Sequence, residues 1–287
     1  MVLHADLHSH SNASDGTTPP ADVMARAAAA GLDVIALTDH DTVAGHAEAA
    51  AALPPGLTLL PGMELSCRLD GHSVHMLAYL FDPANAELAA ELAAIRDSRV
   101  GRARAMVARL AELGAPVTWE QVSEIAGGGV VGRPHVARAL AAAGVVATPA
   151  DAFSPDWIGA GGRAYVSRYA LDPSRAIALV RAAGGVTVLA HPRGAGRGWA
   201  IPDEVIADLA AGGLTGIEIN HPQQDDEQRQ RLRALARGLG LVPSGGSDDH
   251  GELTGFRIGI EQAPEGSYPA LIEQATGAVP ISGPVSG

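Results

Sequence analysis

The sequence contains no lysine, and all 20 of its basic residues are arginine. Schiff-base catalysis, a phosphate-binding loop built around lysine and a metal bridge made by a carboxylated lysine are therefore excluded. Cys67 is the only cysteine. An intramolecular disulfide and a zinc site made of thiolates are excluded as well.

Long apolar runs are also missing. No segment reaches the roughly 18 consecutive apolar residues that mark a membrane span. The N-terminal residues show no basic region followed by an apolar stretch, which is the pattern of a signal peptide. We therefore expect a cytoplasmic protein with no membrane partner.

Positive charge and aromatic residues are scarce. The net charge is −12 and aromatic residues make up 3% of the chain, which disfavours broad, non-specific binding to nucleic acid. A phosphorylated substrate stays possible, because bound divalent cations would reverse the sign of the potential inside a carboxylate-rich pocket.

Apolar residues make up 47% of the 287 residues, enough for a sizeable core. Short apolar runs alternate with alanine-rich helical stretches, which predicts an α/β fold with a parallel sheet, open or closed into a barrel. The expected strands are residues 2–7, 34–38, 57–60, 73–79, 185–190, 216–219 and 241–243. The expected helices between them are residues 20–30, 43–53, 173–183, 203–211 and 224–238.

The stretch 84–167 interrupts this alternation, since its pattern predicts mostly helix. We expect a helical cap (residues 84–167) inserted into a discontinuous barrel core, residues 1–83 and 168–276. The tail, residues 277–287, is rich in Gly, Pro and Ser and is expected to be flexible. One cap helix carries a basic stripe, which we interpret as a solvated face, with a phosphate-steering surface as the alternative: Arg96, Arg99, Arg102 and Arg109.

Side chains that can bind metals follow or lie on seven of the expected strands. The carboxyl ends of parallel strands meet at one edge of such folds, where active sites are built. Because side chains alternate along a strand, His8 and His10 point the same way and can bind one cation together. A single residue of this kind is usually a loop residue or a helix cap, and we expect Asp41 to be an N-cap. Recurrence at seven strands favours a metal centre.

The residue types limit the metal. Imidazoles and carboxylates without thiolates suit Mn²⁺, Fe²⁺ or Zn²⁺. The candidate ligands are too many for one ion, so we expect two or three ions, with Glu64 as a candidate bridge.

Six segments then resemble a known family: DLHSHSNASDGT, ALTDHDT, PGMELS, HMLAY, LAHP and GSDDH. Together they resemble the PHP (polymerase and histidinol phosphatase) family of phosphoesterases over residues 3–250. More narrowly, the chain resembles the subgroup of AMP and nucleoside 3′,5′-bisphosphate phosphatases, whose relatives also trim RNA from the 5′ end. The resemblance implies a distorted (β/α)7 barrel with an inserted helical cap and a site for three metals.

The resemblance also implies roles for individual residues. One metal would be held by His8, His10, Glu64 and Asp248. Glu64 would bridge to a second metal held by His75 and His191, and the third would be held by Asp15, His40 and His250. The expected reaction uses a metal-activated hydroxide, with Asp15, Glu64, His191 and His250 as members of the catalytic site.

Three further residues are candidates for binding substrate phosphate. The cap carries GRPH, with Arg133 and His135, and Arg193 follows His191. The forked donors of arginine suit phosphate. The alternative for Arg133 is a surface residue at the start of a helix, with Pro134 at its first position.

These features predict a metal-dependent phosphatase that acts on a phosphomonoester of a small nucleotide, a nucleoside 3′,5′-bisphosphate or AMP. A cap over the site favours a small ligand, and short RNA is an alternative substrate. Three further functions stay open: a histidinol phosphatase, an amidohydrolase-like C–N hydrolase without a lysine bridge, and a non-catalytic metal-binding module.

Overall fold

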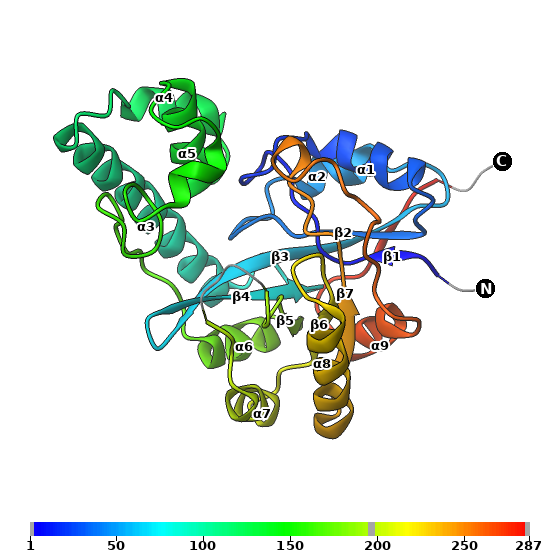
Figure 1. Ribbon diagram of the computed structural model, residues 1–287. Coiled ribbons are helices and arrows are strands. Elements are labelled where there is room, and N and C mark those ends of the chain that lie inside the picture. Colours follow the sequence, from blue (N-terminus) through cyan, green and yellow to red (C-terminus); the bar gives the residue numbers. More distant parts are fainter. Residues whose placement is uncertain (1–2, 195–198, 285–287) are drawn as a thin grey trace.

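The computed structural model describes residues 3–194 and 199–284. Seven strands follow one another around a nearly closed barrel in chain order (Figure 1). They are β1 (Ala5–Asp6), β2 (Val34–Leu37), β3 (Thr58–Leu69), β4 (His72–Tyr79), β5 (Val186–Leu189), β6 (Gly216–Asn220) and β7 (Val242–Gly245). The first and last strands meet through hydrogen bonds from the Leu7 N–H to the Gly245 carbonyl, 3.1 Å, and from the Asp248 N–H to the His8 carbonyl, 2.8 Å. The expected seven-stranded α/β barrel is confirmed.

The sheet is mixed, so the expectation of a parallel sheet is wrong at two places. β3 and β4 form an antiparallel hairpin, and β4 also pairs antiparallel with β5. The hairpin turns through Asp70 and Gly71, both with positive φ. Asp-Gly is favoured in two-residue hairpin turns because both positions need positive φ. The remaining neighbours, β1–β2, β2–β3, β5–β6 and β6–β7, are parallel.

β3 is also longer than the expected strand 57–60. It continues through Pro61 and Gly62 to Leu69, which places Glu64 inside the strand rather than after it. Gly62 permits this continuation, because a Cβ there would lie 2.8 Å from the Tyr79 ring and 2.9 Å from the Ala78 carbonyl oxygen.

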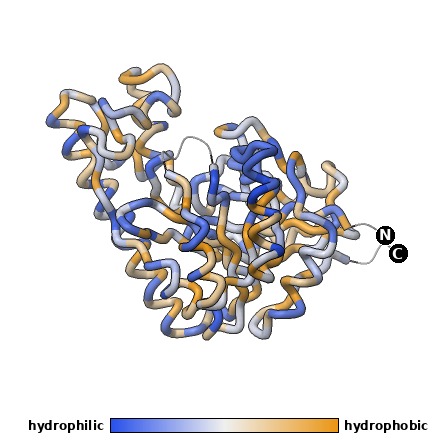
Figure 2. Tube along the Cα trace, turned by 60° about the horizontal axis from the view of Figure 1, so that its bottom comes forward, coloured by the Kyte–Doolittle hydropathy of each residue, from blue (hydrophilic) through white to orange (hydrophobic). Residues whose placement is uncertain are grey.

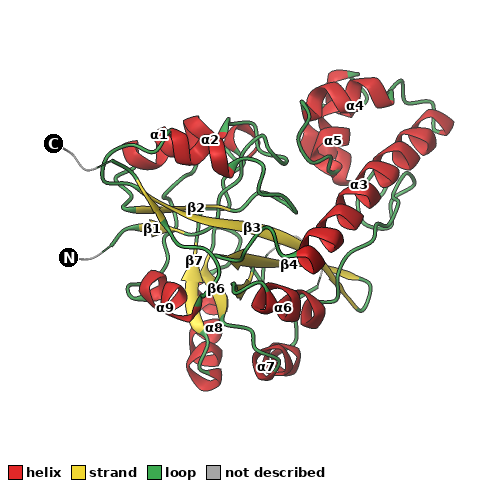
Figure 3. Ribbon diagram, turned by 180° about the vertical axis from the view of Figure 1, so that it is seen from behind, coloured by secondary structure: helices red, strands yellow, loops and turns green. Residues whose placement is uncertain are grey.

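Helices cover the outside of the barrel. In Figures 1 and 3, α1 and α2 lie on one side of the strands, and α6, α7, α8 and α9 lie on the other. The barrel helices are α1 (Pro20–Ala29), α2 (His46–Ala51), α6 (Pro173–Ala182), α7 (Asp203–Ala211), α8 (Asp226–Leu239) and α9 (Ser267–Gln274), with a 3₁₀ turn, η2, at Gly251–Leu253. Their buried faces pack on the strands in three apolar clusters.

Between β4 and β5 the chain forms a group of helices that projects from the barrel (Figure 3). It consists of α3 (Ala86–Glu112), α4 (Trp119–Ala126), α5 (Arg133–Ala142) and the 3₁₀ turn η1 (Pro149–Phe153). It has an apolar cluster of its own, centred on Leu110, Val122 and Val136. Figure 2 accordingly shows hydrophobic stretches in both parts of the molecule.

One long helix joins the two cores. The first half of α3 places Leu88, Leu92 and Ile95 in a barrel cluster. Its second half places Met106 and Leu110 in the cap cluster. α3 therefore packs in both apolar clusters and connects the cap to the barrel.

The C-terminal segment is held against the barrel as far as it is described. β8 (Ile281–Ser282) pairs antiparallel with β3, and the Ala278 N–H donates to the Leu80 carbonyl at 2.6 Å. Of the tail expected to be flexible, residues 285–287 lie outside the described residues. In the described part of the chain, we find no helix long and apolar enough to cross a bilayer.

Candidate metal centre

The nine side chains assigned to metal binding from the sequence converge at one end of the barrel. Eight of them fall into three overlapping groups, in each of which one nitrogen or oxygen atom per residue lies within 4.8 Å of the others. The groups are His8–His10–Glu64–Asp248, His40–Glu64–His75 and His10–Asp15–His40–His250. The ninth, His191, belongs to a fourth such group and has its Nε2 3.0 Å from Oε1 of Glu64.

Glu64 lies at the middle of this cluster. Its inward position on β3 puts both carboxylate oxygens among imidazoles, and its side chain is 1% exposed. Burial raises its pKa, but the surrounding histidines, His75 first, hold the pKa well below its usual range. Its oxygens lie 2.7 Å from His75 Nδ1, 3.0 Å from His191 Nε2, 3.2 Å from His10 Nε2, 3.3 Å from His8 Nε2 and 3.3 Å from His40 Nδ1.

His8 and His10 follow β1 and point toward the same place, as the alternation of side chains along an extended chain predicts. Their Nε2 atoms are 3.2 Å apart. Both also face Oδ1 of Asp248, at 3.4 and 3.3 Å. Burial lowers the pKa of both imidazoles, but the carboxylates around them outweigh burial and raise it, that of His10 to about 10. A divalent cation bound between them would displace these protons and take the converging ring nitrogens as ligands. This buried set of nitrogen and oxygen donors fits a divalent cation.

A second group of donors surrounds Asp15, on the loop after β1. Its oxygens lie 3.3 Å from Nε2 of His250 and 3.7 Å from Nε2 of His40. Burial lowers the pKa of His40 to about 3, which keeps its imidazole neutral and able to bind a metal. Nδ1 of His10 is buried beside Asp15, at 4.0 Å, without a hydrogen-bond partner among the described residues. An unsatisfied buried nitrogen next to a carboxylate also fits a cation.

Glu218 on β6 belongs to the site and was not predicted from the sequence. Its Oε1 lies 3.0 Å from Nδ1 of His8 and its Oε2 accepts the His191 N–H at 2.8 Å. A carboxylate on the outer nitrogen fixes the tautomer of His8 and turns the other nitrogen inward. The available signal was the alternation of β6, which places Glu218 on the barrel interior between two outward-facing isoleucines.

His221 also lies at the centre, although it is not among the nine metal ligands predicted from the sequence. Its Nε2 is 3.2 Å from Oδ2 of Asp248. It forms a further group of potential ligands with His8, His191 and Glu218. His191 and Asp248 have positive φ values of 29° and 50°. Such strained backbone outside glycine is typical of functional sites.

Asp41 is not a helix N-cap, so that expectation is wrong. α2 begins at His46, with Gly45 at the N-cap position. The Asp41 carboxylate instead accepts hydrogen bonds from the Ser66 N–H, the Ser66 hydroxyl and Nε of Arg99, each at 2.7 Å. Burial raises the pKa of Asp41, but the charge of Arg99 outweighs burial and lowers it.

The basic stripe of α3 is not a solvated face throughout. Arg99 and Arg102 are buried, with 6% and 9% of their surface exposed. Arg99 pairs with Asp41, and Arg102 donates to the Val166 carbonyl at 2.7 Å. The expectation is wrong for these two because Asp41 and Ser66 of the barrel contact Arg99, and the segment that contains Val166 contacts Arg102.

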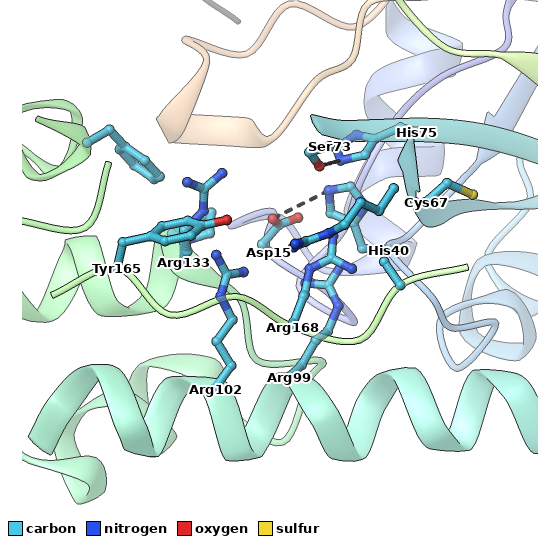
Figure 4. Close-up of a pocket in the computed structure, with 14 residues that line it drawn as sticks. Asp15, His40, Cys67, Ser73, His75, Arg99, Arg102, Arg133, Tyr165 and Arg168 are labelled. Atoms are coloured by element: carbon cyan, nitrogen blue, oxygen red, sulfur yellow. Dashed lines mark hydrogen bonds and ion pairs between the residues drawn. The ribbon is translucent and has the colours of Figure 1, made fainter. Parts of the chain in front are cut away.

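The two buried arginines line a cavity beside the metal centre (Figure 4). Asp15, His40 and His75 form one wall, and the cap supplies the opposite wall. Five arginines line the cavity: Arg68, Arg99, Arg102, Arg133 and Arg168. Burial and the neighbouring charges of Arg133 and Arg168 lower the pKa of Arg102 to about 9. Such crowding of positive charge is typical of an anion site.

The structure places one of the three predicted phosphate-binding residues in this cavity. Arg133, in the first turn of α5, lines it. His135 instead accepts the Gly132 N–H at 2.9 Å and is 1% exposed. Arg193 forms an ion pair with Asp203 and is not among the cavity residues.

Comparison with known proteins places this site in context. Residues 6–115 match the model of the PHP domain. The chain is 36% identical over 251 residues to a 5′-3′ exoribonuclease of Haemophilus influenzae, which covers 87% of this chain and 91% of that protein. It is 35% identical over 263 residues to a 3′,5′-nucleoside bisphosphate phosphatase of Chromobacterium violaceum, which covers 89% and 90%.

Solved structures give the same extent of similarity. A structure from Bifidobacterium adolescentis, described as a candidate metal-dependent phosphoesterase, has a TM-score of 0.89 and 35% identity and covers 96% of this chain and 97% of that one. An amidohydrolase structure from Chromobacterium violaceum, with sulfate and no metal bound, has a TM-score of 0.81 and 33% identity, at 91% of each chain. The similarity therefore includes both the barrel and the cap.

Proposed function

The chain belongs to the PHP family and is a metal-dependent phosphoesterase, and on that premise we propose that its substrate is the phosphomonoester of a small nucleotide, a nucleoside 3′,5′-bisphosphate or AMP. The observation that carries this proposal is the arginine-lined cavity beside the ligand cluster. The bisphosphate phosphatase among the relatives supports it.

We assign two or three divalent cations, Mn²⁺, Fe²⁺ or Zn²⁺, to the nine predicted ligands. The donor set fits them, because it offers buried imidazole and carboxylate atoms and no thiolate. When bound, such cations lower the pKa of water and neutralise charge on a phosphoryl group. Asp15, Glu64, His191 and His250 are members of this catalytic site.

The chain's own residues then bind and orient the substrate. The guanidinium groups of Arg102, Arg133 and Arg168 face the cavity (Figure 4). They attract the phosphate groups of the substrate. Nη1 of Arg168 is buried without a hydrogen-bond partner among the described residues, and a phosphate oxygen would satisfy it. Glu218 holds His8 in the tautomer that metal binding requires.

A second candidate is 5′-3′ exonuclease activity on short RNA. The Haemophilus influenzae relative carries that name. The scarcity of aromatic residues and the net charge of −12 favour the smaller substrate.

The test is phosphate release with Mn²⁺ from adenosine 3′,5′-bisphosphate, AMP, histidinol phosphate, a 5′-phosphorylated oligoribonucleotide and an aryl phosphate. We expect the highest kcat/KM on a nucleotide, and its loss in the double variant His8→Ala/Asp248→Ala. Preference for the oligoribonucleotide would support the second candidate. No release from any compound by protein that holds metal would refute the proposal.

A further inference from the structure

Aromatic side chains are rare in this chain, yet two of them line the cavity. Phe153, at the end of η1, and Tyr165 both belong to the cap and both contribute to the cavity wall. Figure 4 shows the Tyr165 ring on the far side of the cavity from His40 and His75, with Arg133 and Asp15 between them. An aromatic wall therefore faces the metal centre across the anion-binding groups.

Phe153 is exposed at this place. A fraction of 41% of its surface is accessible, although it is one of only three phenylalanines in the chain. The apolar cluster of the cap includes its neighbour Ala152 but leaves Phe153 out. The ring thus contributes little to the cap core, and its open surface is available to a flat ligand.

Arg133 links the two rings. Its guanidinium carbon lies 5.4 Å from the centre of the Phe153 ring and 6.0 Å from that of Tyr165. Cation–π contacts at these distances hold the charge beside the rings. A ligand with an anionic group next to a planar group would meet both features at once.

We propose that Phe153 and Tyr165 form a stacking platform for the nucleobase of the substrate. The inference rests on the proposed function and makes it more specific, since it names the part of the substrate that the cap recognises. The platform takes the base while the phosphate groups lie among the arginines and at the metal centre. Stacking uses the flat face that every base offers, so the platform accepts different bases with little preference.

The test compares two substrates of the metal-loaded enzyme: adenosine 3′,5′-bisphosphate and its analogue with hydrogen in place of the base. Base–aromatic contacts of this kind change binding by about 5-fold to 100-fold. Phe153→Ala should lower kcat/KM on adenosine 3′,5′-bisphosphate by such a factor, mainly by raising KM. It should leave kcat/KM on the analogue unchanged. Phe153→Trp should retain the wild-type preference for the compound that carries the base.

Phe256→Ala is the matched control. Phe256 is also an exposed phenylalanine, at 45%, under an arginine, with the Arg26 guanidinium 4.1 Å from its ring centre, but it does not line this cavity. We expect this variant to keep the wild-type values on both compounds.

The outcomes separate the two claims. An equal loss on both compounds in Phe153→Ala, or no loss on either, overturns the platform while the wild-type turnover still supports the phosphatase. No turnover of either compound by the wild type refutes the proposed function itself. A 5′-phosphorylated tetraribonucleotide is the third substrate. If Phe153→Ala lowers kcat/KM on the tetraribonucleotide by the same factor, the platform binds the base of the first nucleotide of RNA. If the loss is confined to adenosine 3′,5′-bisphosphate, the platform binds the base of a free nucleotide.

Discussion

Replacing Asp41 by asparagine removes the only carboxylate that pairs with the buried Arg99 in the described structure. Asp41 is fully buried, and Arg99 is 6% exposed. The Arg99 charge would be left without its counterion beside Arg102 and Arg168, whose charges repel it. Breaking a buried ion pair by removing one partner costs about 3–5 kcal/mol, so we expect Asp41→Asn to lower the free energy of unfolding by that amount.

The assay is urea unfolding at a fixed, saturating Mn²⁺ concentration, since metal binding adds to the apparent stability. The double variant Asp41→Asn/Arg99→Met should be more stable than Asp41→Asn alone, because it removes the unpaired charge. Glu227→Gln breaks an exposed helix pair with Arg231 and should cost less than about 1 kcal/mol. A loss below about 1 kcal/mol in Asp41→Asn would refute the reasoning.

The ion pair between Asp41 and Arg99 also makes the stability difference between the wild type and Asp41→Asn depend on pH. The pKa of Asp41 in the folded protein is lowered from its ordinary value of 3.8. The ionised form therefore stabilises the fold at every pH above 3.8, and this contribution is lost as the pH falls through the lower, folded pKa. The stability difference between wild type and Asp41→Asn should be constant near neutrality and should shrink below pH 3.8.

Four further variants test other described contacts. Glu218→Gln should weaken metal binding by about 10-fold to 100-fold, measured by competition with a chelating dye, because it disturbs the carboxylate on His8. Gly62→Ala should lower the free energy of unfolding by about 1–3 kcal/mol, because its Cβ would overlap the Tyr79 ring. Gly101→Ala, in the exposed part of α3 with nothing within 4 Å of its Cβ, should instead raise it by about 0.5–1 kcal/mol. Arg133→Met should raise KM for adenosine 3′,5′-bisphosphate by about 10-fold, the loss of one charge-assisted hydrogen bond, with a smaller change in KM for an aryl phosphate, which carries one phosphate group instead of two.

The ligands that follow strands could be predicted because two simple rules act together. Residues at the carboxyl ends of parallel strands meet at one edge, and alternate residues share a face. His8 and His10 illustrate both rules, and their Nε2 atoms are 3.2 Å apart. The same rules give the α/β class and the seven strands.

The remaining features depend on contacts between distant segments. Glu218 was missed because its partners, His8 and His191, are remote in sequence, and the alternation of β6 predicts only that the side chain points inward, not which residues it contacts. Arg99 was taken for a surface residue because helical spacing does not tell which face a distant segment covers. Asp41 was taken for a cap because its true partners, Ser66 and Arg99, lie on other elements.

The antiparallel β3–β4 hairpin was missed for a different reason. The Asp70-Gly71 pair is a local turn signal, but the strand before it was expected to end at residue 60. Pro61 and Gly62 are typical of a turn. The strand nevertheless continues, because Gly62 has no Cβ that would meet the Tyr79 ring.

Metal dependence is the most direct test of the central claim, that a cation cluster around Glu64 hydrolyses a phosphate ester. Phosphate release from adenosine 3′,5′-bisphosphate would be measured after exhaustive chelation and during stepwise return of Mn²⁺, with bound metal counted at each step. We predict that activity disappears on chelation, returns as two or three ions bind per chain, and fails to return in Glu64→Gln. Full activity in the chelated protein, or wild-type activity in metal-loaded Glu64→Gln, would contradict this claim.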